Sequence, residues 1–237
     1  MNNIFHCIDL QEESLEALVA HQIPRWVAAP KLTRLVTLNG ELFTQARRKP
    51  STLRLIRNTP CIADGVGVLA LFRLAKGRRL PRIPGISLIE ALFKVNRYRF
   101  FLLGGREGTL AKASTRLSAS YPGSIVGSHH GYFSAEDWPK IQSEIQAKEP
   151  DIILVGMGFP RQEVVLKTLE AAGVCGLGIG VGGAFEVWAQ TKKRAPNVFQ
   201  SLGLEWLWRL LLSPCRITRF SFVVPYLRLV HKARERL

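Results

Sequence analysis

Short apolar segments that end in glycine or a small polar residue recur along this 237-residue chain, and most are followed by a segment with helical periodicity. Continuous apolar runs are typical of strands buried on both faces, and strands that alternate with helices are typical of βαβ units. The sequence therefore predicts an α/β fold with a parallel sheet covered by helices on both faces. The predicted strands are Leu32–Asn39, Cys61–Asp64, Tyr98–Gly105, Ser124–Phe133, Asp151–Gly158 and Val174–Gly183. The predicted helices are Gly40–Lys49, Gly65–Ala75, Pro84–Val95, Glu107–Tyr121, Ser134–Lys148 and Pro160–Ala172.

The alternation stops after Gly183, and the remainder of the chain has a different composition. From Glu205 to Leu237 there are seven Arg or Lys residues and two acids, interleaved with Trp, Leu, Phe and Val. We expect a catalytic α/β domain over residues 1–195 and a basic helical appendage over residues 196–237. Apolar faces combined with positive charge are typical of segments that dock on an anionic membrane surface, which is the expected role. The alternative is an ordinary pair of C-terminal helices that packs on the α/β domain and leaves its basic ends in solvent.

The formal net charge of +15 and the sequence pI near 10.3 favour an anionic partner. Nucleic acid, a phosphorylated small molecule and an anionic membrane surface all satisfy this condition, and composition does not choose among them. A basic nucleic-acid-binding protein without enzymatic activity is the alternative to an enzyme. That alternative rests on charge alone, since the sequence carries no helix-turn-helix, RRM or KH signature, and it leaves the glycine-ended strands unexplained.

The cysteines argue against a metal site and for a reducing compartment. The four of them are far apart, with no CxxC pair and no Cys/His cluster, so a structural zinc site is not expected. Cys61 and Cys175 stand in apolar segments, where we expect buried thiols. The first 19 residues lack the pattern of a signal peptide, and no uncharged apolar stretch reaches the roughly 18–20 residues needed to span a bilayer. We expect a cytoplasmic protein.

Several residues at the predicted strand ends are candidates for chemistry. Ligands of open α/β sheets bind outside the carboxyl ends of the strands, and glycines there let backbone N–H groups approach a phosphate. Asp64 follows a strand and precedes a glycine, so it is either a turn residue or a catalytic acid. Arg82 is held between two prolines and is the arginine most suited to an anion. Gln162 starts a helix between two apolar segments, and Tyr132 is either a stacking platform or a core residue.

"GIGVGG" (Gly178–Gly183) formally matches a dinucleotide-binding G-x-G-x-x-G motif. That motif requires a following helix, a second strand and an acid about 20 residues on. Position 198 is a valine that leads into the helical tail, so close packing and a tight turn are the better interpretation.

Nine motifs taken together, in order, resemble one known family. They are "TLNGELF", "ADGVGV", "RIPG", "FLLGG", "HGYF", "PDIILVGMGFPRQE", "GVGGAFE", "KRAP" and "LGLEWLWRLLLSPCR", and they span about Leu32 to Arg216. The set closely resembles the WecG/TagA/CpsF family of bacterial glycosyltransferases. The resemblance implies a Rossmann-like body that transfers a sugar from a UDP-sugar donor to an undecaprenyl-diphosphate-linked acceptor, with inversion and without a metal or another cofactor. It also implies cell-surface polysaccharide biosynthesis at the inner face of the cytoplasmic membrane.

The resemblance assigns a role to individual residues. Asp64 matches the proposed general base. Thr37 and Asn39 are expected beside the donor sugar, Gly104 and Gly105 beside phosphate, and the remaining substrate contacts are expected from Arg82, Tyr132, Gln162, Glu186, Arg209, Arg216 and Arg219. Of these, Arg82 and Gln162 would contact sugar or diphosphate, Tyr132 the uracil and Glu186 the ribose. Independently of the resemblance, an arginine of the basic tail (Arg209, Arg216 or Arg219) is expected to reach over the crevice and bind a diphosphate.

Some positions depart from the family pattern. Glu186 stands where the family usually has aspartate, Gln190 where glycine is common, and Ser87 where a polar or acidic residue is usual. The donor therefore stays open among N-acetylmannosamine, its uronic acid, glucose and similar sugars. The acceptor, the pathway and the oligomeric state, a homo-oligomer included, also stay open.

Overall fold

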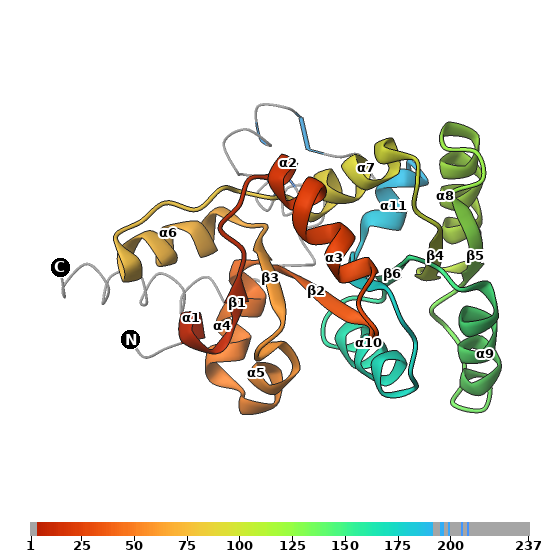
Figure 1. Cartoon of the computed structure of the whole chain (residues 1–237), viewed down its shortest axis with the longest axis horizontal. Coiled ribbons are helices and arrows are strands. Elements are labelled where there is room, and N and C mark those ends of the chain that lie inside the picture. Colours follow the sequence, from red (N-terminus) through yellow and green to blue (C-terminus); the bar gives the residue numbers. More distant parts are fainter. Residues whose placement is uncertain (1–3, 192–194, 197–198, 200–204, 206–207, 209–237) are drawn as a thin grey trace.

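A seven-stranded parallel sheet forms the centre of the computed structural model, which describes residues 4–191, 195–196, 199, 205 and 208 (Figure 1). The strand order is β1-β3-β2-β7-β6-β4-β5, and every neighbouring pair is parallel. The strands are β1 (Asp9–Leu10), β2 (Thr33–Leu38), β3 (Pro60–Ala63), β4 (Phe100–Gly104), β5 (Ile125–His129), β6 (Ile152–Gly156) and β7 (Leu177–Gly180). This confirms the predicted Rossmann-like α/β fold.

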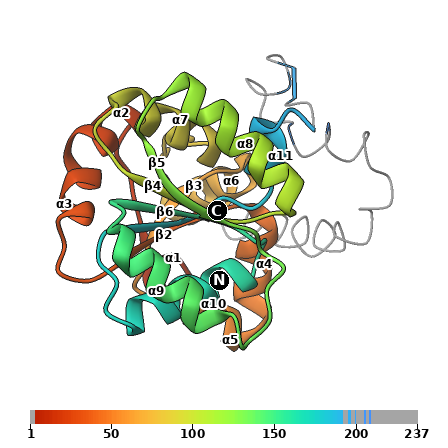
Figure 2. The same cartoon turned by 90° about the vertical axis from the view of Figure 1, so that its right-hand side faces the viewer.

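Helices cover both faces of the sheet, as Figure 2 shows in the view along its edge. One face carries α2 (Leu15–Ala17), the π-helix η1 (Leu18–Gln22), α3 (Ile23–Val27), α7 (Gly85–Val95), α8 (Glu107–Ser120) and α11 (Ala184–Trp188). The other face carries α1 (Ile4–Cys7), α4 (Gly40–Arg48), α5 (Pro50–Ile56), α9 (Trp138–Lys148) and α10 (Arg161–Ala171). Helix α6 (Val66–Lys76) packs against α4 and lies close to strand β3.

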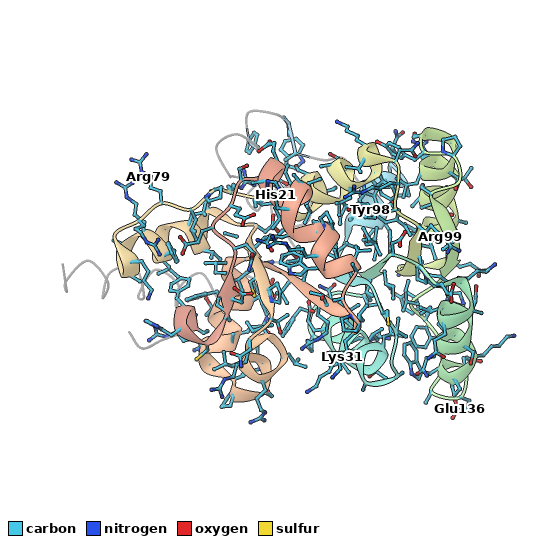
Figure 3. All side chains as sticks on the ribbon, in the orientation of Figure 1. His21, Lys31, Arg79, Tyr98, Arg99 and Glu136 are labelled. Atoms are coloured by element: carbon cyan, nitrogen blue, oxygen red, sulfur yellow. The ribbon has the colours of Figure 1, made fainter. Side chains whose placement is uncertain are left out.

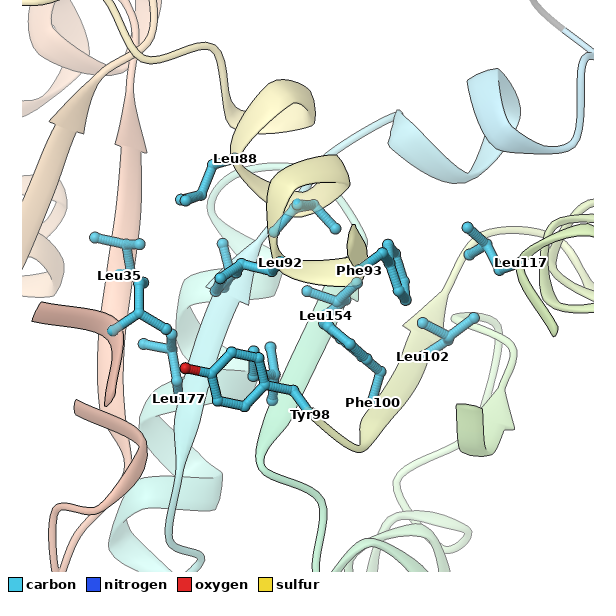
Figure 4. Close-up of a cluster of buried hydrophobic side chains, with 14 of the residues drawn as sticks. Leu35, Leu88, Leu92, Phe93, Tyr98, Phe100, Leu102, Leu117, Leu154 and Leu177 are labelled. Atoms are coloured by element: carbon cyan, nitrogen blue, oxygen red, sulfur yellow. The ribbon is translucent and has the colours of Figure 1, made fainter. Parts of the chain in front are cut away.

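The hydrophobic core is divided by the sheet, because the central strands are apolar on both faces. The five residues of β4 and the five of β6 are all buried, which explains their continuous apolar sequences. On the α7 side, the ring centroids of Phe93 and Phe100 are 4.2 Å apart (Figure 4). Phe93 also stacks on Tyr121, with 5.2 Å between the ring centroids. Two further clusters fill the opposite side, one under α4 and α6 and one under α9 and α10.

Each strand predicted from the sequence is present, with its ends shifted by a few residues. The start of α9 moves further, from Ser134 to Trp138. The Ser134 N–H donates to Asp137 Oδ2 at 3.0 Å and the Asp137 N–H donates to Ser134 Oγ at 3.2 Å, so this pair closes a turn ahead of the helix. Helix α5, strand β1 and the helices before β2 were not predicted.

Two cysteines that we expected to be buried have different surroundings. Cys61 is buried in β3, and burial raises the pKa of its thiol well above the usual range. The expectation for Cys175 is wrong, because it is exposed between Gly173 and Gly176 in the turn that joins α10 to β7.

Two of the basic side chains labelled in Figure 3, Arg79 and Lys31, lie at the periphery of the molecule. Arg79 lies in the exposed loop between α6 and α7, and Lys31 lies just before β2. Among the described residues, no helix combines the length and the apolar character needed to cross a bilayer. The proposed division at residue 195 concerns a segment that lies mostly outside the described residues, so it stays a prediction.

Candidate functional site

Asp64 is the first residue after β3, and its backbone and side chain are both held. Its N–H donates to Leu38 O at 3.0 Å, which continues the pairing of β3 with β2. Its Oδ1 accepts from the N–H of Gly85 at 3.2 Å. Gly85 is the first residue of α7, and a negative charge is stabilised at the N-terminus of a helix. The carboxylate is half-buried, so it is fixed at the sheet edge while it remains near solvent.

Arg82 lies beside Asp64 because the "RIPG" loop, which follows α6 in the chain, returns to the end of β3. The N–H of Ile83 donates to Ala63 O at 3.0 Å, and Arg82 Nε donates to Asp64 O at 3.1 Å. Arg82 Nη2 donates to Glu205 Oε1 at 2.9 Å. The sequence predicted Arg82 as an anion ligand. In the structure its guanidinium is hydrogen-bonded to the backbone carbonyl of the candidate base, Asp64.

Thr37 and Asn39 stand at the end of the neighbouring strand, β2. Thr37 Oγ1 donates to Gly180 O at 3.2 Å, and a Cβ built on Gly85 would lie 2.8 Å from Thr37 Cγ2. Asn39 Oδ1 accepts from the N–H of Leu42 at 2.9 Å and caps α4. A Cβ on Gly65, the residue after Asp64, would lie 3.6 Å from Asn39 Cβ. The structure therefore brings Thr37, Asn39, Asp64 and Arg82 together.

Gln162 is almost completely buried, with 6% of its surface exposed, and its amide serves a structural contact. Its Oε1 accepts from the N–H of Gly182 at 3.1 Å, and its Nε2 donates to Glu163 Oε1 at 3.0 Å. A Cβ on Gly180 would collide with this amide. Gln162 thus holds the turn after β7, next to the Gly180 carbonyl that binds Thr37.

Glu163, the neighbour of Gln162, was not among the candidate residues identified from the sequence. It is 1% exposed, its Oε2 lies buried without a hydrogen-bond partner, and burial raises the pKa of its carboxyl. A signal was available, because Gln162 and Glu163 share a buried helical stripe with Leu166 and Leu169. A polar pair at the head of such a stripe indicates a buried polar contact.

Gly104 and Gly105 lie at the end of β4, where their backbone packs closely against Gly156 at the end of the neighbouring strand β6. The connection after β4 leads to β5 on one side, whereas the connection after β6 leads to β7 on the other, so this is a topological switch point. Gly104 has φ +130° and approaches Gly156 so closely that a Cβ would lie 2.5 Å from its carbonyl oxygen. The Gly105 N–H donates to Gly156 O at 3.0 Å, so a phosphate at this edge would need other donors.

Tyr132 lies after β5, at the outer end of the same sheet edge, and the residue before it contacts this glycine pair. The N–H of Gly131 donates to Gly105 O at 2.9 Å, and Arg161 Nη2 donates to Gly131 O at 3.3 Å. Tyr132 itself is 67% exposed, one of the few large exposed apolar side chains among the described residues. An exposed ring held by a packed glycine suits stacking on a base.

Glu186 and the tail arginines complete the predicted set. Glu186 stands in the first turn of α11 and is half-buried, and a Cβ on Gly183 would lie 3.1 Å from its Oε2. Arg209, Arg216 and Arg219 lie outside the described residues. The part of the chain that the structure describes holds no group of three or more His, Cys, Asp or Glu side chains that could bind a metal ion. Metal independence stays a prediction.

Chemically, this edge combines a fixed carboxylate, a guanidinium on its backbone, a hydroxyl and an exposed aromatic ring. In strand order, Asp64 follows β3, Thr37 ends β2, and Tyr132 follows β5 at the far end. A ligand that contacts both ends must run across β2, β7, β6 and β4. Such an arrangement suits an elongated anionic ligand with a ring at one end and a reacting centre at the other.

Comparisons with known proteins agree with the resemblance seen in the sequence. Residues 5–237 match the model of the glycosyl transferase WecG/TagA/CpsF family. A protein of Staphylococcus aureus strain NCTC 8325 / PS 47 is 36% identical over 207 residues, which cover 86% of this chain and 81% of the relative. It is named N-acetylglucosaminyldiphosphoundecaprenol N-acetyl-beta-D-mannosaminyltransferase. Proteins of strains COL and MRSA252 carry the same name and match to the same extent.

Proposed function

Because the chain belongs to the WecG/TagA/CpsF family of glycosyltransferases, we propose that it transfers a sugar from a UDP-sugar to an undecaprenyl-diphosphate-linked acceptor, with Asp64 as general base. The relatives' name supports the acceptor, since it contains a diphosphoundecaprenol-linked N-acetylglucosamine. The observation that carries the role of Asp64 is its carboxylate, fixed by the Gly85 N–H at the head of α7.

The reaction needs one base. The acceptor hydroxyl has a pKa far above 7, and a carboxylate within about 3 Å can take its proton as the new bond forms. In the proposed step the acceptor oxygen attacks the anomeric carbon, the bond from that carbon to the diphosphate oxygen breaks, and the proton passes to Asp64. The products are the extended lipid-linked saccharide and UDP. A single displacement inverts the anomeric centre, so no second carboxylate is required.

Stabilisation of the departing diphosphate falls to positive groups and backbone dipoles. Negative charge accumulates on the leaving oxygen as the bond breaks, and preorganised donors lower the barrier most where that charge develops. Arg82 donates a hydrogen bond to the backbone of Asp64, and its planar guanidinium presents several donors at once. Tyr132 is proposed to stack on the uracil, and Glu186 to bind the ribose hydroxyls.

N-acetylmannosamine is the donor sugar to test first, because it is the group named for the relatives. Its uronic acid and glucose follow. Glu186, Gln190 and Ser87 depart from the usual family residues, which makes a comparison of several UDP-sugars informative. We place the enzyme on the inner face of the cytoplasmic membrane, where the net charge of +15 would hold it against an anionic leaflet.

The test compares wild type with Asp64→Asn, using UDP-N-acetylmannosamine and an undecaprenyl-diphosphate-linked N-acetylglucosamine. We expect turnover to fall at least about 100-fold, the usual scale for the loss of a general base, while UDP binding stays nearly intact. Asp151→Asn is the matched control, because Asp151 also accepts a backbone N–H, from Arg99 at 2.7 Å, but precedes β6 at the amino edge of the sheet. Near-full activity of Asp64→Asn would remove Asp64 from the mechanism.

A thermal-shift measurement with UDP, NAD and duplex DNA distinguishes the proposed enzyme from the alternative, a nucleic-acid-binding protein. A UDP-sugar enzyme is stabilised by UDP over the other two, since a ligand that binds only the folded state raises its stability. Stabilisation by DNA alone would favour the alternative.

A further inference from the structure

An ion pair joins Glu205 to Arg82, which lies in the loop before α7. Arg82 Nη2 and Glu205 Oε1 are 2.9 Å apart, although the two residues are 123 positions apart in the chain. The side chains are only 19% and 15% exposed. The described residues offer a comparison of equal length, Arg78 with Glu12 at 2.9 Å, but there the side chains are 63% and 43% exposed.

Exposure separates these two pairs energetically. An exposed pair is screened by water and contributes little, whereas the loss of one partner from a mostly buried pair leaves a charge without compensation. We therefore expect removal of the Glu12 carboxylate to be nearly neutral. Removal of the Glu205 carboxylate should displace the guanidinium that it binds.

The guanidinium in question is also bound to the candidate base. Arg82 Nε donates to Asp64 O at 3.1 Å, so one rigid planar group contacts the backbone of Asp64 and the carboxylate of Glu205. A guanidinium that is bound at two points keeps its orientation. The side chain of Asp64 is held separately, because its carboxylate accepts from the Gly85 N–H. The ion pair is therefore placed to fix the loop on which the base stands.

We propose that Glu205 is a positioning residue for the transfer reaction: it holds the Arg82 guanidinium against the backbone of Asp64 and so keeps the catalytic carboxylate in place. This proposal rests on the proposed function. Glu205 does not touch the substrate in this role. It acts through Arg82, and its contribution appears when charge develops on the leaving diphosphate, so its loss lowers kcat more than it raises KM for the donor.

The experiment uses the full-length chain and four single variants: Glu205→Gln, Glu205→Asp, Arg82→Met and the control Glu12→Gln. We expect Glu205→Gln to lose about 10-fold or more in kcat, since a buried charge partner is removed. The donor KM should change by less than about threefold, because ground-state binding uses other contacts. Glu205→Asp retains the charge and should keep more activity than Glu205→Gln. Glu12→Gln should match wild type.

A double-mutant cycle tests whether Glu205 acts through Arg82, whereas the loss of kcat without a matching rise in KM separates positioning from a purely structural role. If Glu205 acts through Arg82, then Glu205→Gln has no further effect on kcat in the Arg82→Met background. Independent effects that multiply would overturn the proposal, as would a Glu205→Gln enzyme as active as Glu12→Gln. Should Glu205→Gln fail to fold in a thermal-unfolding control, the same cycle is run with Glu205→Asp. The effect of that substitution must likewise vanish without Arg82.

Asp64→Asn, measured in parallel, separates the role of Glu205 from the catalytic mechanism on which that role rests. An inactive Asp64→Asn with a fully active Glu205→Gln overturns the role of Glu205 alone. A fully active Asp64→Asn overturns the mechanism on which that role rests.

Discussion

Glu163 is a carboxylic acid with almost no access to water. Desolvation is the largest influence on its pKa and raises it, while the Gln162 amide and the positive charge of Arg34 act in the opposite direction. Its Oε1 accepts the Gln162 amide and its Oε2 has no partner, so an ionised carboxylate is poorly compensated here. The residue holds Gln162, which in turn holds the Gly182 turn at the sheet edge.

The raised pKa of Glu163 determines how the stability of the protein depends on pH. A folded pKa raised above its ordinary value of 4.5 means that the native state holds its proton to higher pH than the unfolded chain. The stabilisation is complete below that ordinary pKa and is lost as pH rises through the folded pKa. We predict that Glu163→Gln removes this loss. Its free energy of unfolding in urea should fall less between pH 5 and pH 8 than that of wild type, and it should be the more stable protein at pH 8.

Glu136→Gln is the control for this measurement. The pKa of Glu136 is lowered, chiefly by a backbone hydrogen bond and then by Ser134, so any stability that it contributes is lost only as pH falls. Between pH 5 and pH 8 this variant should follow wild type. An unchanged slope in Glu163→Gln would mean that the buried carboxyl stays ionised in the native state.

At the scale of elements, Gly104 at the β4–β6 switch point can be tested against Gly108, which lies four positions further along the chain. Gly104 has φ +130°, and an added Cβ would lie 2.5 Å from Gly156 O, a backbone atom that cannot move aside cheaply. Gly108 lies in α8 with nothing within 4 Å of an added Cβ. The two sites should respond to alanine with opposite signs.

We predict that Gly104→Ala lowers the free energy of unfolding by about 2–4 kcal/mol, from backbone strain and overpacking together. Gly108→Ala should raise it by about 0.5–1 kcal/mol, because alanine replaces glycine within a helix. Urea unfolding followed by circular dichroism measures both. Equal effects would mean that the close approach of β4 to β6 relaxes at little cost.

The sequence predicted the elements that carry their own periodicity. Strands such as Phe100–Gly104 and Ile152–Gly156 are apolar throughout, and the helices between them have clear apolar stripes. It missed α5, a seven-residue helix in which Arg54 and Ser51 stand among the apolar positions, and β1, which has two residues. Elements this short obtain their stability from tertiary packing, and their sequences carry too little pattern to be recognised.

The candidate site was predicted in part, for the same physical reason. Asp64, Thr37 and Arg82 follow strand or loop motifs, and parallel strands bring their carboxyl ends to one edge. Contacts across the whole chain leave no local signal. The pairing of Arg82 with Glu205 joins positions 123 residues apart, and the internal use of the Gln162 amide depends on how closely Gly180 approaches it.

At the scale of the whole molecule, two basic regions of the chain contribute to the net charge of +15 and can be tested separately. Residues after Ser213 contain six Arg or Lys and one acid, interleaved with Phe, Val and Leu. The described body carries its own exposed basic run, Arg47, Arg48 and Lys49, at the end of α4. A basic residue near an anionic leaflet contributes about 1 kcal/mol, so either region is able to attract the protein to a membrane.

We predict that docking depends on the C-terminal residues, because they combine charge with apolar faces and because the proposed acceptor lies in the membrane. A chain truncated after Ser213 should stay folded, since the three core clusters lie within the described residues 4–191. It should lose co-sedimentation with vesicles that contain anionic lipid, and lose most activity on the lipid-linked acceptor. A full-length variant with Arg47, Arg48 and Lys49 changed to Gln should keep both. If the truncated chain still binds vesicles and turns over as the full chain does, these residues serve only for packing. If the triple variant loses binding instead, the docking surface lies on the body, beside α4.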